Sequence, residues 1–485
     1  MTNVAHGAIL PLELAADSTK KGSYDCKPTS WPFGYMFTEL QTNRKDLLEE
    51  SAVNNLRGLG MVMEDPANTQ GVLVPAIYTF LGQFIDHDIS REKGSSRVRT
   101  LSDPSPIDPE QIPKDIVNSR SPNLDLDHVY GPDVDGELAP RDAQDPNKLL
   151  IEKVGPGPLG PIPGKDEYND LPRRGDGTAR IGDQRDDENI IISQLHVAFL
   201  RAHNTLVMDH GLPFAAARKL LTQHYQWIVL NDFLDRVLDP VIVKRVRFDG
   251  PKFFNPSRRT FFMPLEFSVA AYRFGHSKVR EGYNDFNCKQ DSGGLDLLFT
   301  NARQRLTDDW VVDWNAFLQP EKRLNLPRPI DPSLTHGLMA LRPKQLDDEK
   351  SVNNLAVRNL LRGYILRMPT GQAVARMMAS EGIVPLMPGE ILSVTQHIPA
   401  LYKFLQTTDF LERTPLWFYI LAEAAFYSRG YHLGPVGSTI VAEVLIGILR
   451  NSTHSILAEP DWRPTLGPTP GKFDITDLLK LAGVF

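Results

Sequence analysis

Cysteine is almost absent from this 485-residue chain, which has only Cys26 and Cys288. Two thiols can form at most one bridge, so a disulfide scaffold and a cysteine metal cluster are both excluded. The chain also lacks a basic excess: 53 lysines and arginines stand against 60 acidic residues, for a net charge of −7. A balance of this sign disfavours a protein whose main partner is nucleic acid.

Long apolar runs are missing too. The longest uncharged apolar run near the C-terminus, residues 444–449, is far shorter than the ~20 residues that cross a bilayer. Residues 1–14 show no basic segment followed by an apolar core, so we expect no Sec-type signal peptide and a cytoplasmic or non-classically secreted protein. Hydrophobic residues make up 41% of the chain and charged residues 23%, which is the composition of an ordinary globular protein.

Apolar residues recur at spacings of three and four along much of the chain, whereas strand-like alternation is scarce. The pattern predicts a mainly α fold: a single large helical domain with long irregular loops and little strand. We expect an N-terminal arm over residues 1–45, the main domain over 46–457, and a C-terminal tail with a short final helix over 458–485. Helices are predicted at residues 71–89, 188–206, 213–236, 352–367, 371–381, 389–406, 416–428 and 437–450.

Histidine is sparse, and the first of two candidates is His87 in Gly-Gln-Phe-Ile-Asp-His-Asp (82–88). Gln83 lies four residues earlier, so the two side chains share a face of the predicted helix. Asp86 and Asp88 point away from His87 and from each other, because successive helical residues diverge by about 100°. The three cannot converge on one ion. They serve three different neighbours, or they form a polar helix end near solvent.

The second candidate is His276 in Tyr-Arg-Phe-Gly-His (272–276), at the end of an apolar stretch that begins at residue 264. By contrast, His196, His203 and His224 lie beside apolar residues in predicted helices. A histidine in such a place is more often a satisfied core or surface group than a catalytic one. His87 and His276 are therefore the histidines that we take as candidates for chemistry.

Residues 182–189, Gly-Asp-Gln-Arg-Asp-Asp-Glu-Asn, lie where a loop meets a predicted helix. Arg185 and Glu188 are three residues apart and can share a face, which suits a polar site. The alternative is structural: Asp186, Asp187 and Glu188 can cap the helix N-terminus and complement its dipole. The two interpretations can hold together.

Residues 121–127 alternate oxygen-bearing side chains with others, at Ser121, Asn123, Asp125 and Asp127. In an extended segment alternate side chains face one side, and four oxygen donors there suit a hard cation such as calcium. The segment is not an EF-hand, because it lacks the glycine and terminal glutamate of that loop. A solvated acidic loop is the alternative.

Taken in this order, the four motifs resemble the animal-type haem peroxidases of the peroxidase–cyclooxygenase superfamily, and most closely its short bacterial members. The resemblance covers roughly residues 30–455 and includes two further motifs, Asn-Leu-Leu-Arg-Gly (359–363) and Leu-Gly-Pro-Val-Gly-Ser (433–438). It implies haem b as the cofactor. It also implies an enzyme that uses hydrogen peroxide to oxidise small donors, either halide and thiocyanate or phenols, through a ferryl intermediate.

The resemblance implies a role for each residue that matches a family motif. His87 matches the distal histidine, Gln83 its companion and Arg185 the distal arginine. The residues implied to contact the haem are His276 as iron ligand, Asn359 as its hydrogen-bond partner, Arg273 and Arg362 at the propionates, and Asp86 and Glu188 as carboxylates that form ester links. The residues implied to bind calcium are Asp88, Ser121, Asn123 through its carbonyl, Asp125 and Asp127. Calcium there would tie the loop to the helix that carries His87.

Two departures from relatives bear on function. Asn189 stands where some mammalian relatives carry a haem-linked methionine, so we expect no sulfonium link and weak chloride oxidation at neutral pH. A fatty-acid oxygenase is the main alternative function. Such enzymes use a radical tyrosine three residues before the proximal histidine. Here that position holds Arg273, and the nearest tyrosine, Tyr272, is expected to point in a different direction. A haem-free structural protein is a third alternative, which the retention of His87 and His276 disfavours.

Overall fold

The computed structural model describes residues 30–49, 51–65, 71–94, 101, 104–131, 138–162, 168–256, 261–320, 325–341, 353–452 and 454–485. Residues 1–29 of the expected arm, including the segment inspected for a signal peptide, lie outside the described residues.

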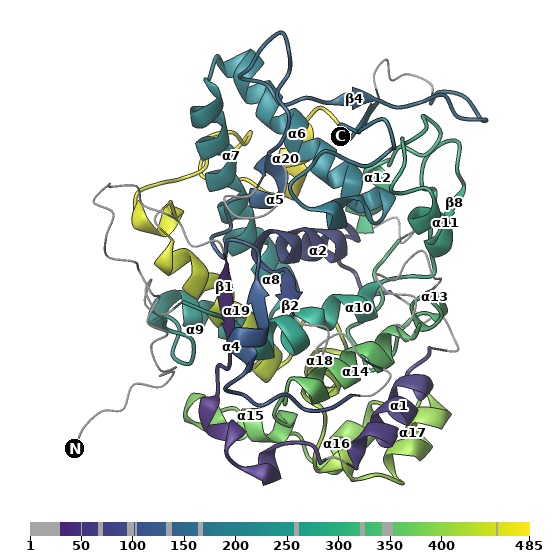
Figure 1. The fold of residues 1–485 in the computed structure, drawn as a ribbon, viewed down its shortest axis with the longest axis vertical. Coiled ribbons are helices and arrows are strands. Elements are labelled where there is room, and N and C mark those ends of the chain that lie inside the picture. Colours follow the sequence, from purple (N-terminus) through teal and green to yellow (C-terminus); the bar gives the residue numbers. More distant parts are fainter. Residues whose placement is uncertain are drawn as a thin grey trace.

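Helices dominate the described chain, as predicted (Figure 1). Those in the centre of the view are α2 (Ile77–Ile89), α4 (Ile112–Asp115), α8 (Leu234–Val237), α10 (Gly275–Lys278) and α19 (Pro435–Asn451), with α9 (Pro240–Asp249) to the left. Those above are α5 (Asp127–Tyr130), α6 (Ile190–His210), α7 (Phe214–Ile228), α12 (Asn315–Leu318) and α20 (Ile475–Leu481). Those below or to the right are α1 (Ala52–Val62), α11 (Leu295–Thr300), α13 (His336–Met339), α14 (Leu355–Ile365), α15 (Gly371–Met377), α16 (Pro388–Ser393), α17 (Pro399–Leu405) and α18 (Leu416–Ser428). Within the described ranges, no helix is long and apolar enough to cross a bilayer.

Strands are few and short. The main sheet has the order β2 (Glu92–Gly94), β3 (Ile116–Asn118), β1 (Trp31–Gly34) and β6 (Met263–Pro264). Two further pairs are β4 (Glu152–Lys153) with β5 (Asn169–Asp170), and β7 (Gly282–Asn284) with β8 (Ser292–Gly294). β1 runs antiparallel to β3, with Trp31 opposite Asn118, and parallel to β6, with Phe33 opposite Met263. The sheet therefore joins the N-terminal arm to the segments that follow α2 and precede α10.

α2, the helix that carries His87, begins at Ile77 rather than at residue 71. Pro75 has no backbone N–H and disfavours helical geometry in the residue before it. The preceding segment is held elsewhere, since the N–H of Val72 donates to the carbonyl of Pro327 at 3.0 Å. Phe84 in α2 stacks on Phe199 of α6 with ring centroids 4.6 Å apart, and both rings are fully buried. This aromatic contact packs α2 against α6.

The other predicted helices are found with one main correction. The expected helix over 213–236 is present as α7, which continues through a π-helical turn, Val229–Phe233, into α8. The expected single helix over 389–406 is wrong, because the structure has two helices there, α16 and α17. Pro399 explains the break: it cannot donate within a helix, but it suits the first helical position, which it occupies in α17.

The segment that leads to His276 consists of three short helical turns of different types. A π-helical turn, Glu266–Ala270, is followed by a 3-10 turn, Ala271–Phe274, and then by α10. The buried Glu266 carboxylate accepts the backbone N–H groups of Met36 and Phe37 at 2.8 and 3.1 Å, which ties the arm to this segment. From α18, Trp417 Nε1 donates to the Arg273 carbonyl at 3.2 Å. The arm and α18 thus hold in place the irregular segment that carries His276.

Candidate active site

A cavity of about 880 Å³ lies where α2, α10 and the turn before α6 come together. His87 and His276 both line it, although they are far apart in the sequence. The volume is within the range of cofactor and ligand sites, about 300–1,000 Å³. The other residues singled out from the sequence that line this cavity are Gln83, Asp86, Arg185, Glu188, Asn189, Tyr272, Arg273 and Arg362.

The last residues of α2 diverge, as helical geometry requires. His87 is 4% exposed and lines the cavity. Asp86 also lies at the cavity wall, where its Oδ1 accepts the Ser90 hydroxyl at 2.9 Å. Asp88 is fully buried on another side, and its Oδ1 accepts the backbone N–H of Asp127 at 3.0 Å. A polar helix end near solvent, the alternative weighed from the sequence, is therefore wrong.

Arg185 enters the cavity wall from the turn Gln184–Asp187. Its Nε and Nη2 donate to the Asp183 carboxylate at 3.1 and 2.7 Å, and Nη2 also donates to the carbonyl of Ser90 at 2.7 Å. Nη1 lies 3.6 Å from Asp86 Oδ2. Burial opposes the charge of this guanidinium, but the Asp183 carboxylate raises the pKa of Arg185 above its usual value. Arg185 therefore stays charged at the cavity wall.

The acidic residues around Arg185 do not cap α6, contrary to the structural alternative. The cap is Asn189, whose Oδ1 accepts the N–H of Ile192 at 3.0 Å. Asp187 instead accepts two hydrogen bonds from Arg173, at 2.6 and 3.0 Å. Asp186 is buried, with its Oδ1 2.7 Å from His87 Nδ1. The contacts of Asp183 and Asp186 with the candidate residues were not anticipated, and the only sequence signal was the density of acidic residues beside Arg185.

His276 lies against Asn359 of α14, with His276 Nδ1 and Asn359 Nδ2 2.8 Å apart. In this arrangement the amide of Asn359 donates and the imidazole of His276 accepts. Arg273 Nη1 donates to Asn359 Oδ1 at 2.8 Å, which leaves the amide nitrogen to face the imidazole. Asn359 then donates and the ring proton belongs on Nε2, whereas an iron ligand needs Nε2 free. A half-turn of the amide reverses the bond.

The electrostatic environment keeps His276 neutral. Burial, together with the charges of Arg273 and Arg358, lowers the pKa of His276 to about 3. A neutral imidazole is the form that binds iron. The arginines that lower this pKa therefore also suit the histidine to ligation.

Basic side chains outnumber acidic ones at the cavity wall. Of the described lining residues, seven are arginine or lysine and three are aspartate or glutamate. All three acids have a basic partner: Arg362 contacts the Glu92 carboxylate, Arg303 Nη2 lies 3.4 Å from Glu188 Oε1, and Arg185 Nη1 lies 3.6 Å from Asp86 Oδ2. In a chain with a net charge of −7, this local excess favours anionic ligands.

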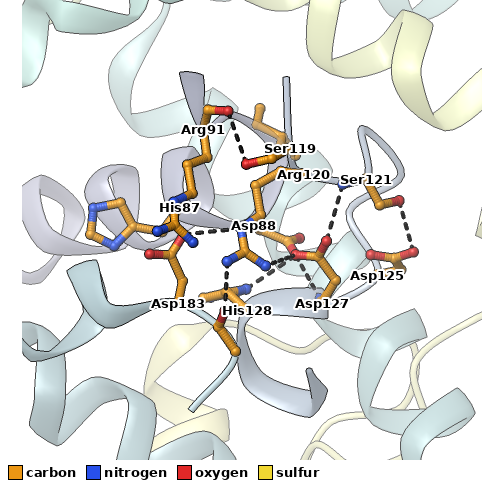
Figure 2. Close-up of polar contacts among 12 residues, drawn as sticks. His87, Asp88, Arg91, Ser119, Arg120, Ser121, Asp125, Asp127, His128 and Asp183 are labelled. Carbon is orange, nitrogen blue, oxygen red and sulfur yellow. Dashed lines mark hydrogen bonds and ion pairs between the residues drawn. The ribbon is translucent and has the colours of Figure 1, made fainter. Parts of the chain in front are cut away.

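The 121–127 loop curls around a buried carboxylate, as Figure 2 shows. Leu124 and Leu126 adopt left-handed backbone angles, with φ of 52° and 58°, so the expected extended conformation is wrong. Ser121 Oγ donates to Asp125 Oδ2 at 3.0 Å, and Asn123 Nδ2 donates to Ser121 Oγ at 2.6 Å. The loop is buried at Ser121 and Asp127, so a freely solvated acidic loop, the alternative weighed from the sequence, is also wrong.

Asp88 and Asp127 come together beneath this loop. One ligand atom from each, and one from His128, lie within 4.8 Å of one another. Asp88 Oδ2 is buried and has no hydrogen-bond partner among the described residues. Burial raises the pKa of Asp127 well above its usual value, Arg120 opposes the rise, and the carboxylates of Asp125 and Asp88 add to it. Buried carboxylate groups that converge in this way suit a hard cation.

Arg120 joins the loop to the turn that carries Arg185. It is fully buried, and its Nε donates to Asp183 Oδ2 at 3.0 Å (Figure 2). Its Nη1 lies 3.4 Å from Asp127 Oδ1, and its Nη2 donates to the carbonyl of Gly182 at 2.6 Å. One guanidinium thus connects the two acidic motifs that the sequence shows separately.

Comparison with known proteins extends this description. Among curated proteins, the chain is 34% identical over 191 residues to a peroxidase-like protein of Margaritifera margaritifera, across 37% of this chain and 23% of that protein. Its fold is similar to that of peroxidase A from Dictyostelium discoideum, with a TM-score of 0.55 and 16% identity over 88% of each chain. It is similar too to a fatty acid alpha-dioxygenase of Oryza sativa, with a TM-score of 0.55 and 12% identity over 84% of this chain and 74% of that one. At these identities the structural likenesses concern the fold alone.

The chain spans less than a quarter of the length of the curated relatives that it matches. The family model of animal haem peroxidases matches residues 95–356, a range that includes three of the four motifs. Because this match covers more than half of the sequence, the chain belongs to the animal haem peroxidase family.

Proposed function

We propose that this chain is a haem peroxidase, an oxidoreductase that uses hydrogen peroxide to oxidise small donors. The observation that carries the proposal is a single cavity lined by one histidine from each of two helices, His87 and His276, with the charged Arg185 beside them. The fold-level likeness to a peroxidase and the family match support it.

The residues around the cavity fit a haem group. His276 offers a neutral imidazole for iron, and Asn359 is placed to hold its other nitrogen. Arg273 and Arg362 offer guanidinium groups to the two propionates, since both line the cavity. Haem iron, when bound, supplies the site that takes up peroxide and the electrons that reduce it.

His87 and Arg185 act on the peroxide in this proposal. His87 takes a proton from one peroxide oxygen and returns it to the other, which departs as water. Arg185 places positive charge where negative charge develops as the oxygen–oxygen bond breaks. Gln83, on the same wall of the cavity, offers an amide that hydrogen-bonds to the bound peroxide or to water.

The experiment that tests this function is spectroscopic. Protein expressed with haem should show a Soret band, which should change when hydrogen peroxide is added and return when iodide or a phenol is supplied. A folded, haem-supplemented protein without a Soret band, or one whose spectrum ignores peroxide, contradicts the proposal.

The charge of the cavity wall favours small anions, such as bromide, iodide and thiocyanate, over phenols as donors. Seven basic side chains against three carboxylates attract anions to the cavity, and added salt screens this attraction. Raising the ionic strength should therefore lower kcat/KM for iodide more than kcat/KM for a neutral phenol. An equal loss for both donors would contradict the preference.

Asp86 and Glu188 are proposed to form ester links with the haem. Both line the cavity, and their side chains are 32% and 29% exposed. Peroxide would be the oxidant: each carboxyl group would lose its proton and bind through one oxygen to a haem methyl carbon, which would give up one hydrogen, while hydrogen peroxide would be reduced to two waters. After peroxide treatment, acidified organic solvent should fail to extract the haem. The Asp86→Ala/Glu188→Ala variant should release it freely, and free release from the wild type would refute the links.

Calcium is proposed to bind between α2 and the 121–127 loop, through Asp88, Ser121, the carbonyl of Asn123, Asp125 and Asp127. The buried Asp88 Oδ2 without a partner among the described residues supports a cation there. Calcium held at a hundred times its Kd would stabilise the fold by about 2.7 kcal/mol. EGTA should therefore lower the unfolding midpoint, and Asp125→Asn should remove most of that response. The site would be refuted if the protein retained no calcium and EGTA left its unfolding midpoint unchanged.

A fatty-acid oxygenase is a second candidate, favoured by Tyr272. Its side chain lines the cavity, and its hydroxyl is buried with no hydrogen-bond partner among the described residues. Against it, Arg273 occupies the position three residues before His276. Oxygen uptake with linoleate or arachidonate, without added peroxide, would favour the oxygenase, whereas peroxide-dependent donor oxidation without such uptake favours the peroxidase.

A further inference from the structure

We propose that Asp186 is a positioning residue for His87. Its carboxylate accepts a hydrogen bond from the Nδ1–H group of the imidazole and so keeps Nε2 turned toward the cavity. This inference rests on the proposed function, in which His87 accepts a proton from peroxide. It adds a residue that lies outside the cavity wall and acts through the distal base.

The contact between the two residues is short and shielded from solvent. His87 Nδ1 lies 2.7 Å from Asp186 Oδ1, and the side chains are 5% and 0% exposed. An ionised carboxylate only accepts hydrogen bonds, so the imidazole must donate at Nδ1. A neutral imidazole carries one ring proton, which leaves the Nε2 lone pair as its basic site. Asp186 therefore selects the tautomer that can take a proton from a ligand in the cavity.

Asp186 is itself fixed by other groups. Its Oδ2 accepts His196 Nδ1 at 2.7 Å, and His128 Nε2 lies 3.8 Å from the same oxygen. Its backbone N–H donates to the carbonyl of Asp183 at 3.0 Å. The carboxylate cannot turn away from His87 without breaking the contact with His196. Burial opposes its charge, but the surrounding imidazoles of His128, His196 and His87 lower the pKa of Asp186.

The turn around Asp186 holds the end of α2 at two points. Arg185 Nη2 donates to the carbonyls of Ser90 and His87, at 2.7 and 3.3 Å, while Asp186 holds the His87 ring. Two consecutive residues of one turn thus hold His87: Arg185 contacts its backbone carbonyl and Asp186 its imidazole. Without Asp186 the imidazole could rotate or place its proton on Nε2, and it would then face peroxide as a donor.

The test uses the haem-loaded protein and follows its reaction with hydrogen peroxide by stopped flow. Asp186→Leu should slow this reaction by about a hundredfold and Asp186→Asn by about tenfold, by analogy with the loss seen when the hydrogen-bond partners of metal-ligating histidines are removed. The later oxidation of iodide should keep its rate. The control Asp209→Asn, at an exposed aspartate of α6 that neither lines the cavity nor contacts Asp186, should stay within about twofold. Asp186→Asn, of nearly the same shape, preserves the test if the leucine variant does not fold.

A double-mutant cycle separates positioning from general damage to the fold. If Asp186 acts through His87, adding Asp186→Leu to His87→Leu should slow the reaction by less than about threefold more. A second readout needs no haem: in protein labelled with ¹⁵N at histidine, the resonances missing from His87→Leu belong to His87. They should show a protonated Nδ1 in the wild type and a mixture of tautomers in Asp186→Leu.

The outcomes distinguish this inference from the function on which it rests. Wild-type peroxide rates in Asp186→Leu, an unchanged His87 tautomer, or a full further loss in the double variant would overturn the role of Asp186 and leave the peroxidase proposal standing. Wild-type rates in His87→Leu would instead overturn the assignment of His87.

Discussion

Reaction with peroxide is expected to slow by at least about a hundredfold when His87 is replaced by leucine, the lower end of the usual scale of acid–base catalysis. Leucine is apolar and suits a position that is 4% exposed, so the fold should persist. The variant has no group at this position that can move a proton between the peroxide oxygens. The measurement is the second-order rate with limiting peroxide, normalised to haem content from the Soret band.

A matched control comes from the same helix. Thr79 in α2 also lines the cavity, and Thr79→Val removes a hydroxyl with little change of shape. This variant should react with peroxide within about twofold of the wild type. A haem-loaded His87→Leu protein that reacts as fast as wild type would refute the role of His87.

Replacing Asp183 with alanine is expected to lower the free energy of unfolding by about 3–5 kcal/mol, the cost of breaking a buried ion pair from one side. Asp183 is 1% exposed and accepts hydrogen bonds from the guanidinium groups of both Arg120 and Arg185. Its removal takes the closest carboxylate from two guanidinium groups, one of which is fully buried. Against a typical stability of about 5–15 kcal/mol, such a loss is large. The measurement is the guanidinium unfolding transition followed by circular dichroism.

The same variant should also react more slowly with peroxide, because Arg185 loses the carboxylate that fixes its Nε and Nη2. Glu459→Ala is the control, since the ion pair of Glu459 with Lys219 is about half exposed and such pairs contribute about 1 kcal/mol or less. An Asp183→Ala protein with the unfolding transition of the control would show that Arg120 and Arg185 find other partners.

Much of the fold could be predicted from the sequence, because its helices carry clear apolar periodicity. The corrections at α2 and at α16 and α17 came from Pro75 and Pro399, whose effects on helix boundaries are local and could have been read. The curled conformation of the 121–127 loop could not be predicted. Leucine rarely adopts left-handed backbone angles, so nothing about Leu124 and Leu126 indicated that they would do so.

The candidate site divides in the same way. The divergence of Asp86, His87 and Asp88 follows from helix geometry alone, and the pairing of His276 with Asn359 came from the family resemblance. The contact of Asp186 with His87 joins residues 99 positions apart and depends on how α2 packs against the turn before α6. No local pattern carries that information, and capping was the natural interpretation of an acid beside a helix.

Arg120 has a consequence for protein engineering. A designer who transplants the 121–127 loop onto another scaffold, with its preceding residue, would import a guanidinium that is fully buried here and that donates to Asp183 and to the carbonyl of Gly182. The host would have to supply both acceptors in the same place. The portable unit is therefore the loop together with a segment 63 positions further along the chain, and neither piece is expected to work as a graft by itself.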